Sequence, residues 1–266
     1  MSALALLLIA VGLADLVSAR DWPHPLLARR VGALVGLASI AALALLADLD
    51  GWGDLALLAV VALTTGAWVV LVGRAVATDR GQGRALGVFA LGVALTLLLA
   101  GWSSPVGGAV ARWLAWTDLG VLAGADPTHV LLLAGLVLVQ LSTGNIIVRL
   151  VLEHTGALNP LGEPQPSDRL RGGRLLGPME RVFILGLGLA GQVTAASIVI
   201  AAKGLIRWPE LQRASRDSER REAAQEAADQ DTRRAASIDQ VTEYFLIGSF
   251  VSWLIAMTAL AVSRLA

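Results

Sequence analysis

The chain contains no cysteine, a single tyrosine and few charged residues, which make up 16% of its 266 positions. Without cysteine it has no disulfides, no thiolate metal ligands and no thiol nucleophile. The formal net charge of zero gives no indication of a nucleic acid or an anionic surface as a partner. The low share of charge is also atypical of water-soluble domains, where about a quarter of the residues are charged.

Hydrophobic residues make up 56% of the sequence and are gathered into blocks. A block of about 20 such residues is long enough to cross the roughly 30 Å of bilayer hydrocarbon as a helix. The blocks are rich in Leu, Ala, Val and Gly and do not alternate with polar residues, which excludes a membrane β-barrel. Because backbone groups in lipid must be paired internally, we predict an all-α, polytopic transmembrane helix bundle.

The blocks predict seven membrane spans and two further segments outside the membrane. The spans cover approximately residues 3–19, 31–47, 55–77, 85–100, 129–152, 178–206 and 241–262. Residues 109–124 contain two tryptophans and favour an interfacial helix, because indole rings prefer headgroup depth. Residues 207–240 are rich in Arg, Glu, Gln and Ala and predict a polar, solvent-exposed spacer helix. Six spans therefore belong to residues 1–206, and the last one to residues 241–266.

The loops give conflicting indications of membrane orientation. Basic loops follow the first and third predicted spans, which places the N-terminus outside under the positive-inside rule. The loops on both sides of residues 178–206 are also rich in Arg, yet one spanning helix cannot have both ends in the cytoplasm. Two solutions remain open: translocation of the spacer, or a crossing by residues 109–124 that makes eight spans.

Asp15 is the deepest acidic residue of the first predicted span. A charge near the bilayer centre costs roughly 2.5–3.5 kcal/mol on insertion scales, so the side chain must face protein or water. Two interpretations are open. The carboxylate either lies at the interface, held by Arg20 or a neighbouring helix, or couples to a proton or cation.

A polar stripe is predicted along the span 129–152, where four residues share one helical face: Ser142, Asn145, Arg149 and Glu153. Arg149 and Glu153 can pair directly. Two interpretations of the stripe are open. Its small polar side chains either form hydrogen bonds that hold neighbouring helices together, or line a polar cavity.

The span 178–206 contains GLGLAG (186–191), which has the spacing of a dinucleotide-binding loop. Within a spanning helix, however, these glycines favour close helix packing. Gln192 in mid-membrane needs a hydrogen-bond partner, for which Asn145 is the candidate. Lys203 is predicted to extend its ammonium group to the interface.

The last span begins with Glu243 and Tyr244 and continues with a stripe of small residues, which predicts a packing seam. The members of the stripe are Gly248, Ser252 and Ala256. Glu243 is predicted to form a structural ion pair with Lys203 or Arg207.

Templates of known enzyme sites are mostly absent. Asp48, Asp50 and Asp54 superficially resemble the metal-binding acids of lipid-headgroup transferases, but the rest of that motif is missing. A polar turn is the favoured interpretation. The three histidines show no ligand spacing, so neither a metal site nor a cofactor is predicted.

Several short motifs stand together in the last third of the chain: GRLLG (173–177) with Glu180-Arg181, then Gln192, AAKGLIRW (201–208) and EYFLIGS (243–249). Together they resemble a family of bacterial inner-membrane proteins that is known only as a domain of unknown function. VGLADL (11–16) is similar to the family's His-x-x-Ala-Asp-Phe, with Val11 replacing His and Leu16 replacing Phe. The resemblance implies no activity. It implies characteristic positions at Glu180, Arg181, Gln192, Lys203, Arg207, Glu243 and Tyr244.

Three functional hypotheses follow. The first is a non-catalytic component of the bacterial cytoplasmic membrane that binds a protein partner through residues 209–240. The second is permeation of a small solute or ion along a polar seam between the last three spans. The third, with the least support, is a membrane-embedded enzyme, which requires Asp15, Asp48 or His154 to converge. A homo-oligomer is left open. The predicted seam comprises Asn145, Arg149, Glu153, Glu180, Arg181, Gln192, Lys203, Arg207, Glu243 and Tyr244, with Asp15 as a secondary candidate.

Overall fold

The structure, a computed structural model, describes residues 1–19, 24–117, 120, 124–158, 173–202, 205 and 235–265. In this part of the chain all regular secondary structure is helical. The chain forms two compact units, Met1–Ile147 with Thr258–Ala266, and Val148–Met257. We describe each unit by itself.

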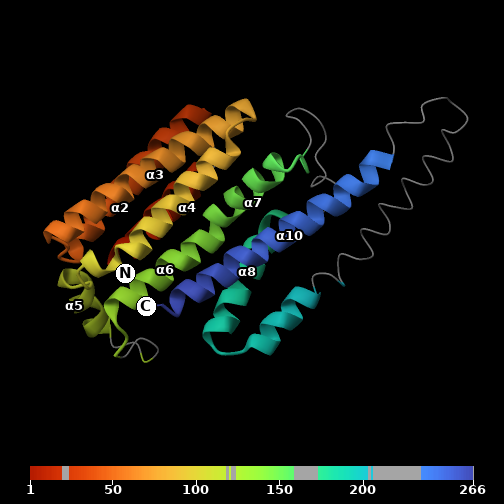
Figure 1. The fold of residues 1–266 in the computed structure, drawn as a ribbon. Coiled ribbons are helices and arrows are strands. Elements are labelled where there is room, and N and C mark those ends of the chain that lie inside the picture. Colours follow the sequence, from red (N-terminus) through yellow and green to blue (C-terminus); the bar gives the residue numbers. More distant parts are fainter. Residues whose placement is uncertain are drawn as a thin grey trace, which may run out of the picture. The chain divides into compact units, whose positions relative to one another are not determined.

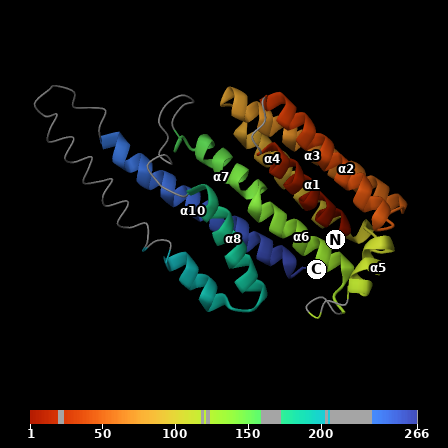
Figure 2. The same cartoon turned by 180° about the vertical axis from the view of Figure 1, so that it is seen from behind.

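The first unit is built from apolar helices that run side by side, and α1, α2, α3 and α4 alternate in direction (Figures 1 and 2). Pro25 begins α2 at a position where its missing N–H costs nothing, and Asp126 caps α6 by accepting a hydrogen bond from the backbone N–H of His129. The helices of this unit are α1 (Ser2–Ser18), α2 (Pro25–Leu46), α3 (Trp52–Thr78), α4 (Gln82–Leu98), η1 (Ala100–Trp102), α5 (Gly108–Thr117), α6 (Pro127–Leu141), the start of α7 (Thr143–His154) and the end of α10 (Ala235–Ser263).

The centre of the first unit is α1, which contacts α2, α3, α4 and α6. Its residues from Ser2 to Gly12 are all buried, as are Ala14 and Asp15. A helix that is apolar all round can bury its whole surface, and the sequence of α1 meets that condition. Glycines permit the close packing: a Cβ at Gly135 of α6 would lie 2.9 Å from the Cβ of Leu8.

The second unit contains the end of α7, helix α8 (Gly173–Leu189), the short helix Val193–Ala202 and most of α10 (Ala235–Ser263). The chain reverses direction between α8 and the short helix (Figures 1 and 2). Gly191 in this turn has φ +73°, a left-handed conformation that glycine adopts without a steric penalty. Residues 173–202 therefore form a helical hairpin.

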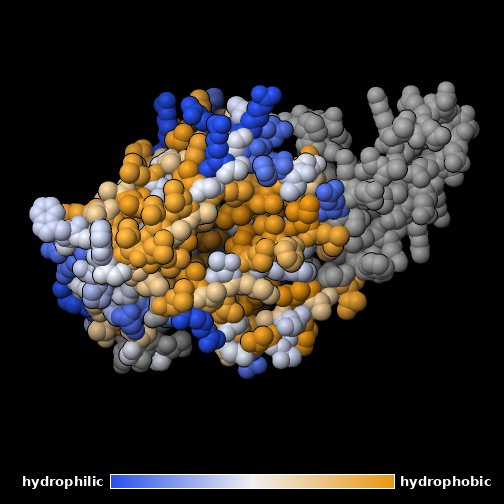
Figure 3. Space-filling model, in the orientation of Figure 1, coloured by the Kyte–Doolittle hydropathy of each residue, from blue (hydrophilic) through white to orange (hydrophobic). Residues whose placement is uncertain are grey.

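Within the described part of the chain, three helices are long and apolar enough to cross a membrane: Leu26–Leu46, Trp52–Thr78 and Glu243–Ser263. The pair α6 and α7, bent by 46°, makes a fourth candidate if it forms one broken span. Helices α1 and α4 are apolar but shorter, at 17 residues each. On the face shown in Figure 3, hydrophobic residues cover the middle of α2, α3 and α4, and hydrophilic residues gather near the helix ends. The described residues are thus all-α, and their three or four candidate spans indicate a multi-pass membrane protein. The predicted number of seven spans stays a prediction.

Two predicted spans need correction. The helix predicted over 129–152 is broken at Ser142, so Ser142 does not continue the helical face of Asn145, Arg149 and Glu153. The continuous helix predicted over 178–206 is wrong, because α8 ends at Leu189 and the chain turns back. The interfacial helix predicted over 109–124 is described as α5, which ends at Thr117.

Candidate functional site

A buried carboxylate lies inside the first unit, on the last turn of α1. The side chain of Asp15 has 4% relative exposure, and the indole N–H of Trp68 on α3 donates to both carboxylate oxygens at 3.1 Å. The ring of Trp68 is fully buried and lies 5.0 Å from that of Phe89 on α4, measured between centroids. Asp15 is therefore held by the aromatic core of the bundle. Its predicted partner Arg20 lies outside the described residues.

The break between α6 and α7 brings further polar groups to this level of the bundle. Ser142 donates its hydroxyl to the backbone oxygens of Gly12 and Leu138, at 2.8 and 2.9 Å. The buried hydroxyl of Thr143 approaches the Asp15 carboxyl without meeting full hydrogen-bond geometry. Gln140, one turn earlier, is fully buried as well. We define Asp15, Trp68, Ser142 and Thr143 as the Asp15 cluster.

The Asp15 cluster surrounds one buried carboxylate with neutral hydrogen-bond donors. Among the described residues Asp15 makes no ion pair, so its charge is balanced only by neutral donors. A carboxylate in such surroundings either holds a proton or needs a cation, because an isolated buried charge is costly. Helix breaks at membrane depth supply backbone groups that can serve such a site.

A second polar group ties together one end of the first unit. Asp54, at the start of α3, accepts hydrogen bonds from the backbone N–H and the hydroxyl of Ser104, at 2.8 and 2.7 Å. The hydroxyl of Ser2 donates to the carbonyl of Ser104. Burial lowers the pKa of the Met1 α-amino group, while Asp126 and Asp54 act to raise it. These contacts explain why Asp54 serves as a structural anchor for the 103–106 loop.

In the second unit, α8 and α10 are joined by two pairs of adjacent residues. The indole N–H of Trp253 donates to Oε1 of Glu180 at 2.7 Å, and Nη1 of Arg181 donates to the hydroxyl of Ser252 at 3.1 Å. Glu180 and Arg181 are 8% and 1% exposed. Both were predicted as site residues, and here they face α10.

The small-residue stripe on α10 lies in this packed region. A Cβ at Gly248 would lie 3.6 Å from Leu152 and 3.8 Å from Val148, so α7 packs close to α10 there. Ala256 is fully buried, and Ser252 accepts the hydrogen bond from Arg181. The stripe thus lies in a packing seam, as the sequence predicted.

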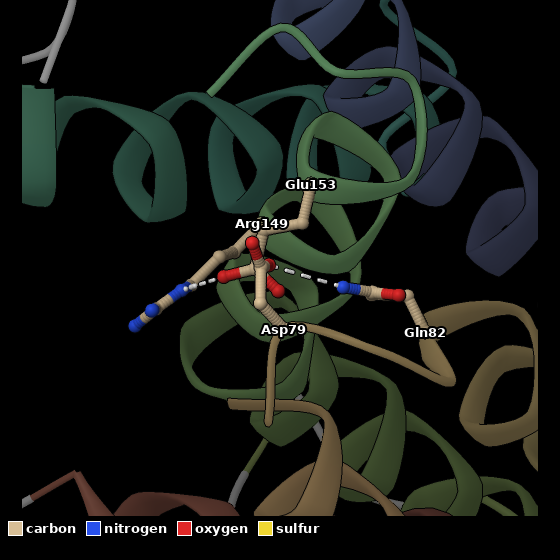
Figure 4. A network of polar contacts seen from close by, with 4 residues as sticks. All are labelled: Asp79, Gln82, Arg149 and Glu153. Carbon is tan, nitrogen blue, oxygen red and sulfur yellow. Dashed lines mark hydrogen bonds and ion pairs between the residues drawn. The ribbon is translucent and has the colours of Figure 1, made fainter. Parts of the chain in front are cut away.

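Arg149 and Glu153 form the predicted ion pair along α7, with Nε of Arg149 donating to Oε1 of Glu153 at 2.7 Å (Figure 4). Arg149 is exposed, whereas Glu153 is mostly buried. Asn145, two turns before Glu153, is exposed on the same helix. An ion pair four residues apart on a helix typically contributes little to stability, about 0.3–0.5 kcal/mol.

Other predicted seam residues are placed at the surface or cannot be placed. Gln192 is exposed and follows the turn at Gly191, so it is not in the middle of a helix as predicted. Its proposed pairing with Asn145 joins different units and stays a prediction. Glu243 is exposed and Tyr244 is half-buried on α10. Lys203 and Arg207 lie outside the described residues, and so does the ion pair predicted for them.

Sequence reasoning missed the tryptophan partners of the buried residues Asp15 and Glu180. Trp68 and Trp253 were the two tryptophans inside predicted spans, away from the headgroup depth that indole rings prefer. An indole N–H in hydrocarbon needs an acceptor, so each of these residues implied a buried partner. That signal could have led from Trp68 to Asp15 and from Trp253 to Glu180.

No group of three or more His, Asp or Glu side chains suited to a metal ion occurs in the described part of the chain. Asp15 lies in the last turn of α1, whereas Asp48 lies beside Gly108 at the far end of α2, so these two acids do not converge. Comparison with protein-family models, curated proteins and solved structures finds no match. The resemblance of the last third to a bacterial inner-membrane family stays a prediction.

Proposed function

We propose that this chain is a non-catalytic component of the bacterial cytoplasmic membrane that crosses the bilayer six times and presents residues 207–240 to a cytosolic protein. The observation that carries the proposal is the reversal of the chain at Gly191. It replaces a crossing by residues 178–206 with a hairpin that enters and leaves on one side.

The orientation of the first five crossings is argued from charge. Where α2 begins and α3 meets α4, the chain is rich in Arg. The opposite end of these helices is acidic. Under the positive-inside rule the basic end faces the cytoplasm and the N-terminus lies outside. The basic end contains Arg29, Arg30, Arg74, Arg80 and Arg84, and the acidic end Asp48, Asp50, Asp54 and Asp126.

The hairpin removes the conflict that the sequence left open. If α6 and α7 form one broken span, the Arg-rich loop after His154 is cytoplasmic. A hairpin over 173–202 then returns the chain to the same side, so that the charged spacer is cytoplasmic too. The helix α10 makes the sixth crossing and ends outside. Neither translocation of the spacer nor a crossing by 109–124 is needed.

Because the chain lacks cysteine, a single introduced cysteine is its only thiol. Labelling of that thiol therefore tests this topology without a signal from other residues. We expect Ser218→Cys in the spacer to react with a membrane-impermeant maleimide only after the cells are permeabilised. Ala77→Cys, at the basic end of α3, is the cytoplasmic control, and Gly101→Cys, at the acidic end, the external one. A reporter fusion at residue 225 gives a second readout. Labelling of Ser218→Cys in intact cells would refute the proposed topology.

Partner binding is tested separately, by replacing residues 209–234 with a Gly/Ser linker of equal length. We expect the variant to reach the membrane at wild-type levels and to lose a partner that co-purifies with the unaltered chain. A control variant with the same residues in scrambled order separates specific recognition from net composition. Unchanged co-purification by the linker variant would rule out the spacer as the binding segment.

A second candidate function, ion or proton permeation, is favoured by the Asp15 cluster. The carboxylate lies between α1 and α3 with neutral donors only, beside a helix break. In this hypothesis Asp15 binds and releases a proton during transport. Proteoliposomes with an internal pH-sensitive dye are expected to show proton flux that Asp15→Asn abolishes. Equal flux in both proteins, or none in either, would exclude this function.

A further inference from the structure

A cavity opens at the hairpin between α3 and α4, within the first unit. Its volume is about 510 Å³. It is lined by Leu71, Arg74, Thr78, Arg80, Gly81 and Arg84. Three of these six residues carry a permanent positive charge, and they come from both helices and from the turn between them.

The charges of these three arginines are not neutralised by the described part of the protein, in which none of the three forms an ion pair. The nearest acidic residue in sequence is Asp79, in the turn itself. Its carboxylate accepts a hydrogen bond from the side chain of Gln82 at 3.3 Å (Figure 4). The cavity therefore keeps an excess of positive charge.

The first turn of α4 adds further donors at the same place. Gly81 is the N-cap, with φ +89°, and no side chain caps the first N–H groups of this 17-residue helix. Asp79 is also left-handed, at φ +52°, and Arg80 and Arg84 flank the first residue of the helix, Gln82. Uncapped N–H groups together with the positive end of the helix dipole favour an anion.

We propose that this hairpin, defined as the arginine pocket, binds a phosphate group. A guanidinium group donates two parallel N–H hydrogen bonds to the oxygens of a phosphate. This paired geometry makes arginine clusters selective for phosphate over monatomic anions such as chloride. The pocket lies at the end of α3, which is a candidate membrane span, and Leu71 supplies an apolar wall next to it. The phosphate comes either from an anionic phospholipid or from a free phosphate compound in the cytosol.

The test uses the purified full-length protein in detergent. The probe for the lipid source is phosphatidylglycerol, compared with phosphatidylcholine, with bound lipid counted by native mass spectrometry. The probe for the free source is inorganic phosphate, compared with chloride at equal ionic strength, with the shift in Tm as the readout. The variant is Arg80→Gln/Arg84→Gln, and a control with the same change of charge outside the pocket is Arg30→Gln/Arg112→Gln.

We expect the pocket variant to bind its ligand at least about tenfold more weakly than the wild type, since the loss of even one charge-assisted hydrogen bond weakens binding roughly tenfold or more. The control variant is expected to stay within about twofold of the wild type. Selective loss of phosphatidylglycerol binding identifies a headgroup, and loss of the phosphate-induced Tm shift identifies a free ligand. The proposal is overturned if the wild type binds neither probe, or if the two variants bind equally.

Discussion

Trp253 of α10 donates its indole N–H to Glu180 of α8 at 2.7 Å, which joins residues that are 73 positions apart in the sequence. The neighbouring pair, Arg181 and Ser252, joins the same two helices. Two polar contacts side by side fix both the rotation of α8 and its position along α10. In an apolar solvent, polar contacts and close packing replace the hydrophobic effect as the forces between helices.

This hydrogen bond predicts that Glu180→Gln retains most of the stability of the protein, whereas Glu180→Ala does not. Glu180→Gln keeps an oxygen that accepts the Trp253 N–H, whereas Glu180→Ala leaves this donor without the acceptor. We expect Glu180→Ala to lose about 1–3 kcal/mol of stability and Glu180→Gln clearly less. Thermal unfolding in detergent measures the order. Glu243→Ala, at an exposed position of α10, should stay within about 0.5 kcal/mol of the wild type.

The Asp15 cluster predicts that Trp68 stabilises the first unit through its N–H group as well as through its ring. Trp68→Phe keeps an aromatic ring beside Phe89 but removes the donor to Asp15. The expected loss is about 1–3 kcal/mol, the cost of a buried acceptor that loses its partner. Trp113→Phe, at an exposed position on α5, is the matched control and should unfold with the wild-type Tm. Equal effects of the two substitutions would contradict this role.

Close packing between α3 and α4 predicts opposite outcomes for two glycines on the same helix. A Cβ at Gly92 would lie 2.2 Å from Cγ2 of the buried Thr64, whereas a Cβ at Gly87 meets no atom within 4 Å. We expect Gly92→Ala to cost about 1–3 kcal/mol through overpacking. Gly87→Ala should be neutral, or stabilise the helix by up to about 1 kcal/mol. Thermal unfolding of both variants tests whether α3 and α4 pack as described.

The hairpin turn predicts that alanine is penalised at Gly191 but not at Gly186, five residues earlier within α8. Alanine at Gly191 would have to adopt φ +73°, which costs roughly 1–2 kcal/mol for a residue with a side chain. Gly186→Ala, within α8 and in open space, should have the opposite sign because alanine favours helix. Hydrogen exchange of residues 186–202 measures the local stability. A stabilising effect of Gly191→Ala would indicate a continuous helix and refute the hairpin.

The sequence by itself determined that the chain is all-α and multi-pass, and where most helices lie. The length of an apolar block is a local property of the sequence. In a bilayer such a block forms a helix, because its backbone N–H and C=O groups must be paired within the segment. The ion pair of Arg149 and Glu153 could be read in the same way, since positions four apart meet on any helix. The sequence of α1, apolar around its whole circumference, was also compatible with its central position.

The tertiary structure alone decided where helices break and which distant residues meet. Gly144 favours a break near Ser142 but does not fix its place, whereas the Ser142 hydroxyl donates to the backbone oxygen of Gly12, 130 positions away. The turn at Gly191 lies inside a block long enough to span, so composition favoured a continuous helix. A hydropathy average covers residues that are adjacent in the sequence, so it contains no information about contacts between distant helices. The energy of a buried polar group depends on the partner that another helix brings to it.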